Sequence, residues 1–148
     1  MIYLDTSALI KRFVEETGSA QVEKLVLERA PASTATLAYV EVYSGLSRKR
    51  RDDELTNSQF DEIRAQFEDD WPSYVRVHLR DEVLHLARDL VRRHPLRALD
   101  AVHVASALRL QSLLDTEVTF VAGDRRSLDA ARAEGMYVID PEAGSRDD

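Results

Sequence analysis

The sequence predicts an α/β fold, a three-layer α/β/α sandwich with a central parallel sheet covered by helices on both faces. Short apolar runs such as VTFVAGD at 118–124 alternate along the chain with longer segments of helical periodicity. No two of these runs are joined by an Asn-Gly or Asp-Gly pair, which is the usual signal of an antiparallel hairpin. Strands that alternate with helices form parallel sheets through right-handed crossovers.

The N-terminal part of the chain predicts one strand and two helices. MIYLD at 1–5 is a short apolar strand, and TSALIKRFVEETG at 6–18 has the polar start and the terminal glycine of a helix. A second helix begins at Ser19 and ends before Pro31, because proline cannot continue a helix.

The next part, up to Pro72, predicts a brief strand and two long helices. The first helix follows the strand in STATLAYVEVYSGLSRKRR. Its apolar face contains Tyr39, Val42, Tyr43 and Leu46. Thr56 and Gln59 have the spacing of a capping box, which predicts the start of the second helix.

The C-terminal half repeats the alternation of strands and helices. The amphipathic segment RDEVLHLARDLVRRHP is separated by Pro95 from the almost wholly apolar helix that contains ALDAVHVASAL. The predicted elements are a strand at 74–79, helices at 80–94 and 98–114, a strand at 118–124, a helix at 125–135 and a strand at 136–141.

Composition predicts one domain over residues 1–141 and a short polar C-terminal tail at 142–148. A chain of 148 residues that is 44% hydrophobic can bury a core without disulfides. It contains no cysteine, which fits a reducing cytoplasm and excludes thiolate metal sites. Its longest uncharged run has 11 residues, too few to span a membrane. The net charge of −7 argues against broad, non-specific binding to nucleic acid.

Four acidic residues are placed where they can meet at one edge of the predicted sheet. Asp5 and Asp124 each follow a strand, and Glu41 and Asp100 lie in the first turns of their helices. Ligands of open α/β sheets bind outside the carboxyl ends of the strands. A structural interpretation is also open, because Asp is a preferred helix N-cap and a first-turn acid stabilises the helix dipole.

Four ionised carboxylates at one place need a counter-charge. At about 5 Å and an effective dielectric near 20, each pair repels by roughly 3 kcal/mol. Either some of these acids keep their protons or a divalent cation is bound, and an all-oxygen set suits Mg²⁺ or Mn²⁺.

Neighbouring polar residues have two interpretations each. His103 could complete a metal pair with Asp100, but packing or hydrogen bonding behind the site is the favoured role. Ser7 and Thr6 can cap the first helix or bind a water. Arginines at helix ends are usually solvated, yet three of them are the candidates to bind a phosphate backbone because they adjoin the acids: Arg97, Arg125 and Arg126.

The order of these motifs resembles the PIN-domain family, in particular the VapC-type toxins of type II toxin-antitoxin pairs. The motifs are YLDTSALIK, YVEVYSGL, LRALDAVHVASAL and VAGDRRSLDAA. The resemblance implies a Mg²⁺- or Mn²⁺-dependent endoribonuclease, with Asp5 and Asp100 as principal metal ligands and Glu41 and Asp124 completing the set directly or through waters. It also implies a homodimer and a cognate VapB-like antitoxin.

The corresponding hypothesis is hydrolysis of an RNA phosphodiester by a metal-activated water, which leaves a 3'-hydroxyl and a 5'-phosphate. Two alternatives stay open. A receiver-like signalling domain would have adjacent acids after the first strand, where YLDTS has one. A non-catalytic binding module would use all its acids as helix caps, and its stability would not respond to Mn²⁺.

Overall fold

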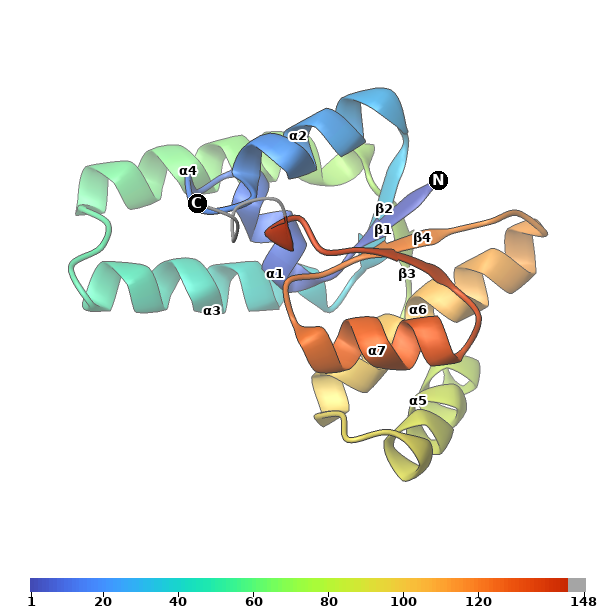
Figure 1. Ribbon diagram of the computed structural model, residues 1–148. Helices are drawn as coiled ribbons and strands as arrows, with labels where there is room; N and C mark the ends of the chain where they lie inside the picture. Colours follow the sequence, from blue (N-terminus) through green and yellow to red (C-terminus); the bar gives the residue numbers. More distant parts are fainter. Residues whose placement is uncertain (144–148) are drawn as a thin grey trace.

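The computed structural model describes residues 1–143 and contains five parallel strands in one sheet (Figure 1). The strands are β1 (Ile2–Leu4), β2 (Ala32–Ala35), β3 (Val75–Val77), β4 (Thr119–Val121) and β5 (Tyr137–Ile139). All four pairings between neighbours are parallel. The five predicted strands are therefore confirmed.

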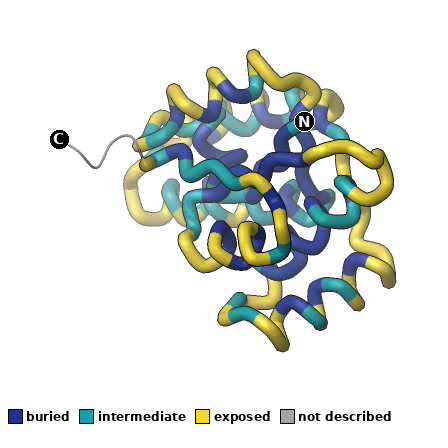
Figure 2. Tube along the Cα trace, turned by 45° about the vertical axis from the view of Figure 1, so that its right-hand side comes forward, coloured by how far each residue is buried: buried dark blue, intermediate teal, exposed yellow. Residues whose placement is uncertain are grey.

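Helices cover both faces of the sheet and make two separate cores. One core belongs to α1 (Thr6–Leu9), α2 (Ser19–Glu28), α3 (Ala38–Arg51) and α4 (Asn57–Asp70). The other belongs to α5 (Asp81–Arg93), α6 (Ala98–Leu114) and α7 (Arg125–Ala133). β1, β2 and β4 are buried throughout, and Figure 2 shows the buried interior between helices whose outer sides are exposed. The predicted α/β/α sandwich is confirmed, and no helix within residues 1–143 is long and apolar enough to cross a membrane.

The order of the strands identifies where a ligand would bind. The order is β3-β2-β1-β4-β5, so the chain leaves β1 toward one edge of the sheet and β4 toward the other. This reversal makes the carboxyl ends of β1 and β4 the topological switch point. A flavodoxin-like receiver has the order 2-1-3-4-5, so the receiver-like alternative is wrong.

The predicted helix at 6–18 is shorter than expected. α1 ends at Leu9 and continues only as a 3₁₀ turn, Ile10–Arg12. The backbone NH groups of Phe13 and Val14 both bond to Ile10 O, at 3.0 Å each, which closes the turn. Gly18 has φ +91° and precedes α2 as its N-cap, so this glycine begins the second helix and does not end the first.

The C-terminal segment packs against that turn. A Cβ on Gly18 would lie 3.0 Å from Pro141 O, which leaves room for glycine only. Glu142, assigned by the sequence to the tail, bonds to Lys11 Nζ at 2.9 Å. The rest of the predicted tail, 144–148, lies outside the described residues.

The hairpin of α3 and α4 projects from the sheet in Figure 1 and is held by aromatic side chains. Phe67 on α4 is fully buried, with its ring centroid 5.8 Å from that of Tyr39 and 6.0 Å from that of Tyr43, both on α3. The predicted capping box is present, with both reciprocal hydrogen bonds between Thr56 and Gln59. The aromatic contacts fix α3, which carries Glu41.

Candidate active site

Asp5 and Asp124 flank the switch point, one after β1 and the other after β4. Both are N-caps: Asp5 accepts from the NH of Ala8 at 2.9 Å, and Asp124 accepts from the NH of Ser127 at 3.1 Å. The structural interpretation of these two acids is therefore correct, and it leaves room for a second role because capping occupies one carboxylate oxygen.

Asp5 is held by one oxygen only. Its Oδ1 accepts from Ala8 N and from Ser7 Oγ, the latter at 2.6 Å. Ser7 Oγ in turn accepts from Gly123 N at 2.9 Å, so this hydroxyl joins the end of β1 to the residues after β4. Within residues 1–143, Asp5 Oδ2 has no hydrogen bond to the protein.

Asp124 and Glu41 repeat this arrangement. Asp124 Oδ2 accepts from Ser127 N and, at 2.8 Å, from Ser127 Oγ. Glu41 Oε1 accepts from Thr6 Oγ1 at 2.8 Å and lies 2.6 Å from His103 Nε2. In the described part of the chain the other oxygen of each carboxylate has no protein partner.

The three unpartnered oxygens are not completely enclosed by the protein. In residues 1–143, every buried side-chain nitrogen or oxygen has a hydrogen-bond partner. Asp5 Oδ2, Glu41 Oε2 and Asp124 Oδ1 have none, so they are accessible to solvent. A carboxylate that is fixed through one oxygen and open at the other is suited to bind a cation with that second oxygen.

Asp100 lies with Asp124 in a pocket of about 280 Å³ that also exposes Arg97 and Arg126. Burial raises the pKa of Asp100, and the nearby Asp124 raises it further, while Arg97 acts in the opposite direction. Two carboxylates and two guanidinium groups therefore share one small space. Arg125, the third predicted substrate contact, does not line this pocket.

The surroundings shift the pKa values of Asp5 and Glu41 in opposite directions. Burial raises the pKa of Asp5, with Asp100 adding to the shift and the hydrogen bonds from Ser7 and Ala8 opposing it. Burial would also raise the pKa of Glu41, but the hydrogen bonds from His103 and Thr6 outweigh it and lower that pKa. The structure thus stabilises the charge of Glu41 and destabilises those of Asp5 and Asp100.

The donor set fits a hard divalent cation. All four acids offer oxygen, and their mutual repulsion is the kind that a cation relieves. Within residues 1–143, no three Asp, Glu or His groups are close enough to hold one ion together. Mg²⁺ usually keeps several waters and is held by one or two carboxylates, so Asp100 and Asp124, which line one pocket, are sufficient for such an ion.

Sequence reasoning favoured packing or hydrogen bonding for His103, and the structure shows both, while the contributions of Tyr3 and Lys11 were missed. His103 is 3% exposed and binds Glu41 and Tyr3 with its two ring nitrogens. A tyrosine in the middle of an apolar strand was an available signal, because a buried hydroxyl needs a partner. No sequence signal indicated Lys11.

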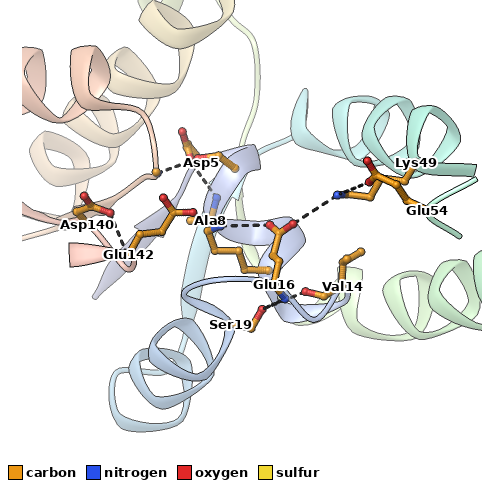
Figure 3. A network of polar contacts seen from close by, with 12 residues as sticks. Asp5, Ala8, Val14, Glu16, Ser19, Lys49, Glu54, Asp140 and Glu142 are labelled. Carbon is orange, nitrogen blue, oxygen red and sulfur yellow. Dashed lines mark hydrogen bonds and ion pairs between the residues drawn. The ribbon is translucent and has the colours of Figure 1, made fainter. Parts of the chain in front are cut away.

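Lys11 forms two ion pairs in the wall of a larger groove beside the acids. Its ammonium group lies 3.2 Å from Glu16 and 2.9 Å from Glu142. Glu16 also pairs with Lys49 at the end of α3 (Figure 3). The groove has a volume of about 600 Å³ and continues to Asp124. Because its cations are mostly paired with acids, it adds little positive potential to the site.

Comparison with known proteins gives consistent matches over nearly the whole chain. Residues 2–132 match the PIN domain family. Ribonuclease VapC45 of Mycobacterium tuberculosis (strain CDC 1551 / Oshkosh) is 36% identical over 138 residues, which are 93% of this chain and 94% of the relative. Ribonuclease VapC46 of Mycobacterium tuberculosis (strain ATCC 25618 / H37Rv) is 33% identical over 144 residues, covering 95% and 97%.

Two solved structures have a fold similar to that of this chain. FitAcB from Neisseria gonorrhoeae has a TM-score of 0.70 at 17% identity and covers 97% of this chain and 99% of its own. A toxin-antitoxin complex from Klebsiella pneumoniae has a TM-score of 0.62 at 16% identity, with 95% and 98% covered. The resemblance that the four acidic motifs suggested is confirmed, and the chain belongs to the PIN-domain family and, within it, to the VapC group.

Proposed function

We propose that the chain is a metal-dependent endoribonuclease, the toxin of a VapBC-type toxin-antitoxin pair. Relatives of the same length that are 36% identical are named ribonucleases. The observation that carries the proposal is the state of three carboxylates: Asp5, Glu41 and Asp124 are each fixed through one oxygen, and the other oxygen has no protein partner within residues 1–143.

The cofactor in this proposal is Mg²⁺, with Mn²⁺ as a functional substitute. Asp5 and Asp100 would be its principal ligands, and Glu41 and Asp124 would complete the set directly or through waters. Such an ion lowers the pKa of water and offsets the charge of a phosphate. The hydrogen bonds from Ser7, Ala8 and Ser127 keep the capping oxygens turned away, so each open oxygen keeps its direction.

The arginines of the 280 Å³ pocket bind the substrate in this proposal. Arg97 and Arg126 line the same space as Asp100 and Asp124. A guanidinium group binds phosphate through two parallel hydrogen bonds, so these two side chains orient the phosphodiester beside the acids. Cleavage then leaves a 3'-hydroxyl and a 5'-phosphate.

The test is cleavage of a mixed RNA pool by the purified protein. We expect cleavage with Mg²⁺ or Mn²⁺, none with EDTA, and recovery when Mg²⁺ is added in excess over the chelator. The melting temperature should also rise on adding Mn²⁺, because a ligand that binds only the folded state stabilises it. Cleavage that survives EDTA, or an unchanged melting temperature, contradicts the proposal and favours a binding module.

Arg126 and Arg125 give a matched pair of variants on the same turn of α7. We expect Arg126→Ala to lower kcat/KM by about 10- to 150-fold, since a hydrogen bond to a charged group contributes about 1.5 to 3 kcal/mol. Arg125→Ala removes an equal charge outside the pocket and should change kcat/KM by less than about twofold. Equal losses in the two variants, measured at one ionic strength, would show that only net charge matters.

The partner and the assembly follow from the same proposal. A cognate VapB-like antitoxin would cover the acidic site, the active form would be a homodimer, and the reaction would take place in the cytoplasm, which the absence of cysteine fits. Addition of a purified VapB-like antitoxin, which should inhibit RNA cleavage, tests the first point. Sedimentation of the purified protein tests the second.

A further inference from the structure

His103 connects the central strand of the sheet with Glu41 on α3. Its side chain is 3% exposed in the middle of α6. Nδ1 lies 2.8 Å from the hydroxyl of Tyr3 on β1, and Nε2 lies 2.6 Å from Glu41 Oε1. Thr6 Oγ1 is 3.1 Å from the same Nε2 and donates to the same Oε1. Three elements distant in the sequence thus meet at one imidazole.

The direction of these hydrogen bonds follows from the groups that make them. An ionised carboxylate can only accept, so Nε2 carries a proton and donates to Glu41. In a neutral ring Nδ1 is then an acceptor, and Tyr3 donates to it. The phenolic hydroxyl of tyrosine carries its proton at neutral pH and can donate it. The Tyr3 contact therefore selects the tautomer that donates to Glu41.

We infer that Tyr3 and His103 are positioning residues that fix Glu41 with one oxygen held and the other directed to the reaction site. This inference rests on the proposed function. His103 does not itself bind the metal, because both of its ring nitrogens are already engaged by the protein. The pair acts through Glu41, whose flexible side chain would otherwise have to be ordered when substrate binds.

A packing role alone does not explain this geometry. An apolar residue of similar volume would fill the same space between α6 and β1. It would leave the hydroxyl of Tyr3, which is fully buried, without this partner, and it would leave Thr6 as the only described donor to Glu41. The two donors converge on Oε1 and none binds Oε2 within residues 1–143, which is the pattern of an oriented ligand.

Two substitutions at His103 separate positioning from packing. The amide nitrogen of Gln reaches the place of Nε2, whereas that of Asn reaches only the place of Nδ1. We expect His103→Gln to keep kcat within about threefold of the parent. His103→Asn should lower kcat and Mn²⁺ affinity by about 10- to 100-fold, the usual loss when a partner behind a metal ligand is removed, with KM for RNA changed by less than about threefold.

A double-mutant cycle tests whether the effect passes through Glu41. In a Glu41→Ala background, His103→Asn should lower kcat and Mn²⁺ affinity by less than about threefold, because interacting residues are not additive. The ¹⁵N NMR spectrum of the imidazole should show the Nε2–H tautomer in the parent protein and a mixture of tautomers in Tyr3→Phe.

The outcomes distinguish this inference from the proposed function. If the parent protein binds Mn²⁺ and cleaves RNA, equal losses in His103→Gln and His103→Asn overturn the inference and leave the function intact. The inference is also overturned if His103→Asn lowers kcat and Mn²⁺ affinity as much in the Glu41→Ala background as in the parent. An Nδ1–H tautomer in the parent spectrum overturns it as well. If the parent protein neither binds Mn²⁺ nor cleaves RNA, the proposed function has failed and the inference fails with it.

Discussion

Asp5→Asn is expected to lower the rate of RNA cleavage by more than about 100-fold and, at the same time, to raise the melting temperature of the metal-free protein. The loss of activity follows from the role of Asp5 as a principal ligand, because metal assistance supplies several kcal/mol and each 1.36 kcal/mol is tenfold in rate. The gain in stability has a different origin, in the cost of the buried charge.

Burial raises the pKa of Asp5, with Asp100 adding to the shift, so the folded state disfavours the ionised carboxylate. Asn removes that charge and still caps α1, since Asn and Asp are about equally good at the N-cap. The amide oxygen can continue to accept from Ser7 and from the NH of Ala8. The substitution therefore removes an unfavourable charge without removing the hydrogen bonds that shape the turn.

The gain in melting temperature should be larger at neutral pH than at low pH. An acid with a raised pKa in the folded state favours the folded state at low pH, and this contribution is lost as pH rises through the folded pKa. Near pH 7 the Asn variant should melt higher than the parent. At a pH below the usual pKa range of carboxyl groups, the two melting temperatures should converge, because the parent then carries no charge at Asp5.

Asp100→Asn should behave in the same way, since burial and Asp124 raise the pKa of Asp100. The control is Asp129→Asn on α7, where the carboxylate is 62% exposed and pairs with Arg132; it should change neither cleavage nor melting temperature appreciably. Thermal unfolding in EDTA, beside a cleavage assay in Mn²⁺, measures both effects. A stability loss in both site variants would show that these charges are structural.

The placement of Asp5 and Asp124 could be predicted because it depends on local features. Each follows a strand that short apolar runs identify, and parallel strands end at the same edge. Asp100 was found because an acid in an otherwise apolar helix is conspicuous. The exact strand order was not predicted, since it is decided by packing between helices distant in the sequence.

The details of the site could not be predicted for a related reason. The contact between Glu41 and His103 joins residues 62 positions apart, and no local pattern encodes which nitrogen meets which oxygen. The distinction between Arg126 and Arg125 depends on the rotation of α7, which shifts adjacent side chains by about 100°. The burial of Lys11 depends on Glu142, which lies 131 positions away in the sequence.

Phe67→Ala is expected to destabilise the protein by about 3 to 5 kcal/mol, the usual cost of removing a fully buried Phe side chain. The ring centroid of Phe67 lies 5.3 Å from that of Phe13 and 5.5 Å from that of Trp71, and the ring also packs against the two tyrosines of α3. A total stability of about 5 to 15 kcal/mol is typical of a single domain, so this one side chain accounts for a large share of it.

The control for Phe67→Ala is Phe67→Leu, which keeps most of the buried volume and should lose clearly less stability. Urea unfolding monitored by the fluorescence of Trp71, the only tryptophan, measures both losses. At a temperature where Phe67→Ala remains folded, cleavage should be nearly unchanged, because Thr6 and His103 hold Glu41 from the side of the sheet. A loss of cleavage in the folded variant would show that the aromatic cluster also positions Glu41, in addition to stabilising the helix that carries it.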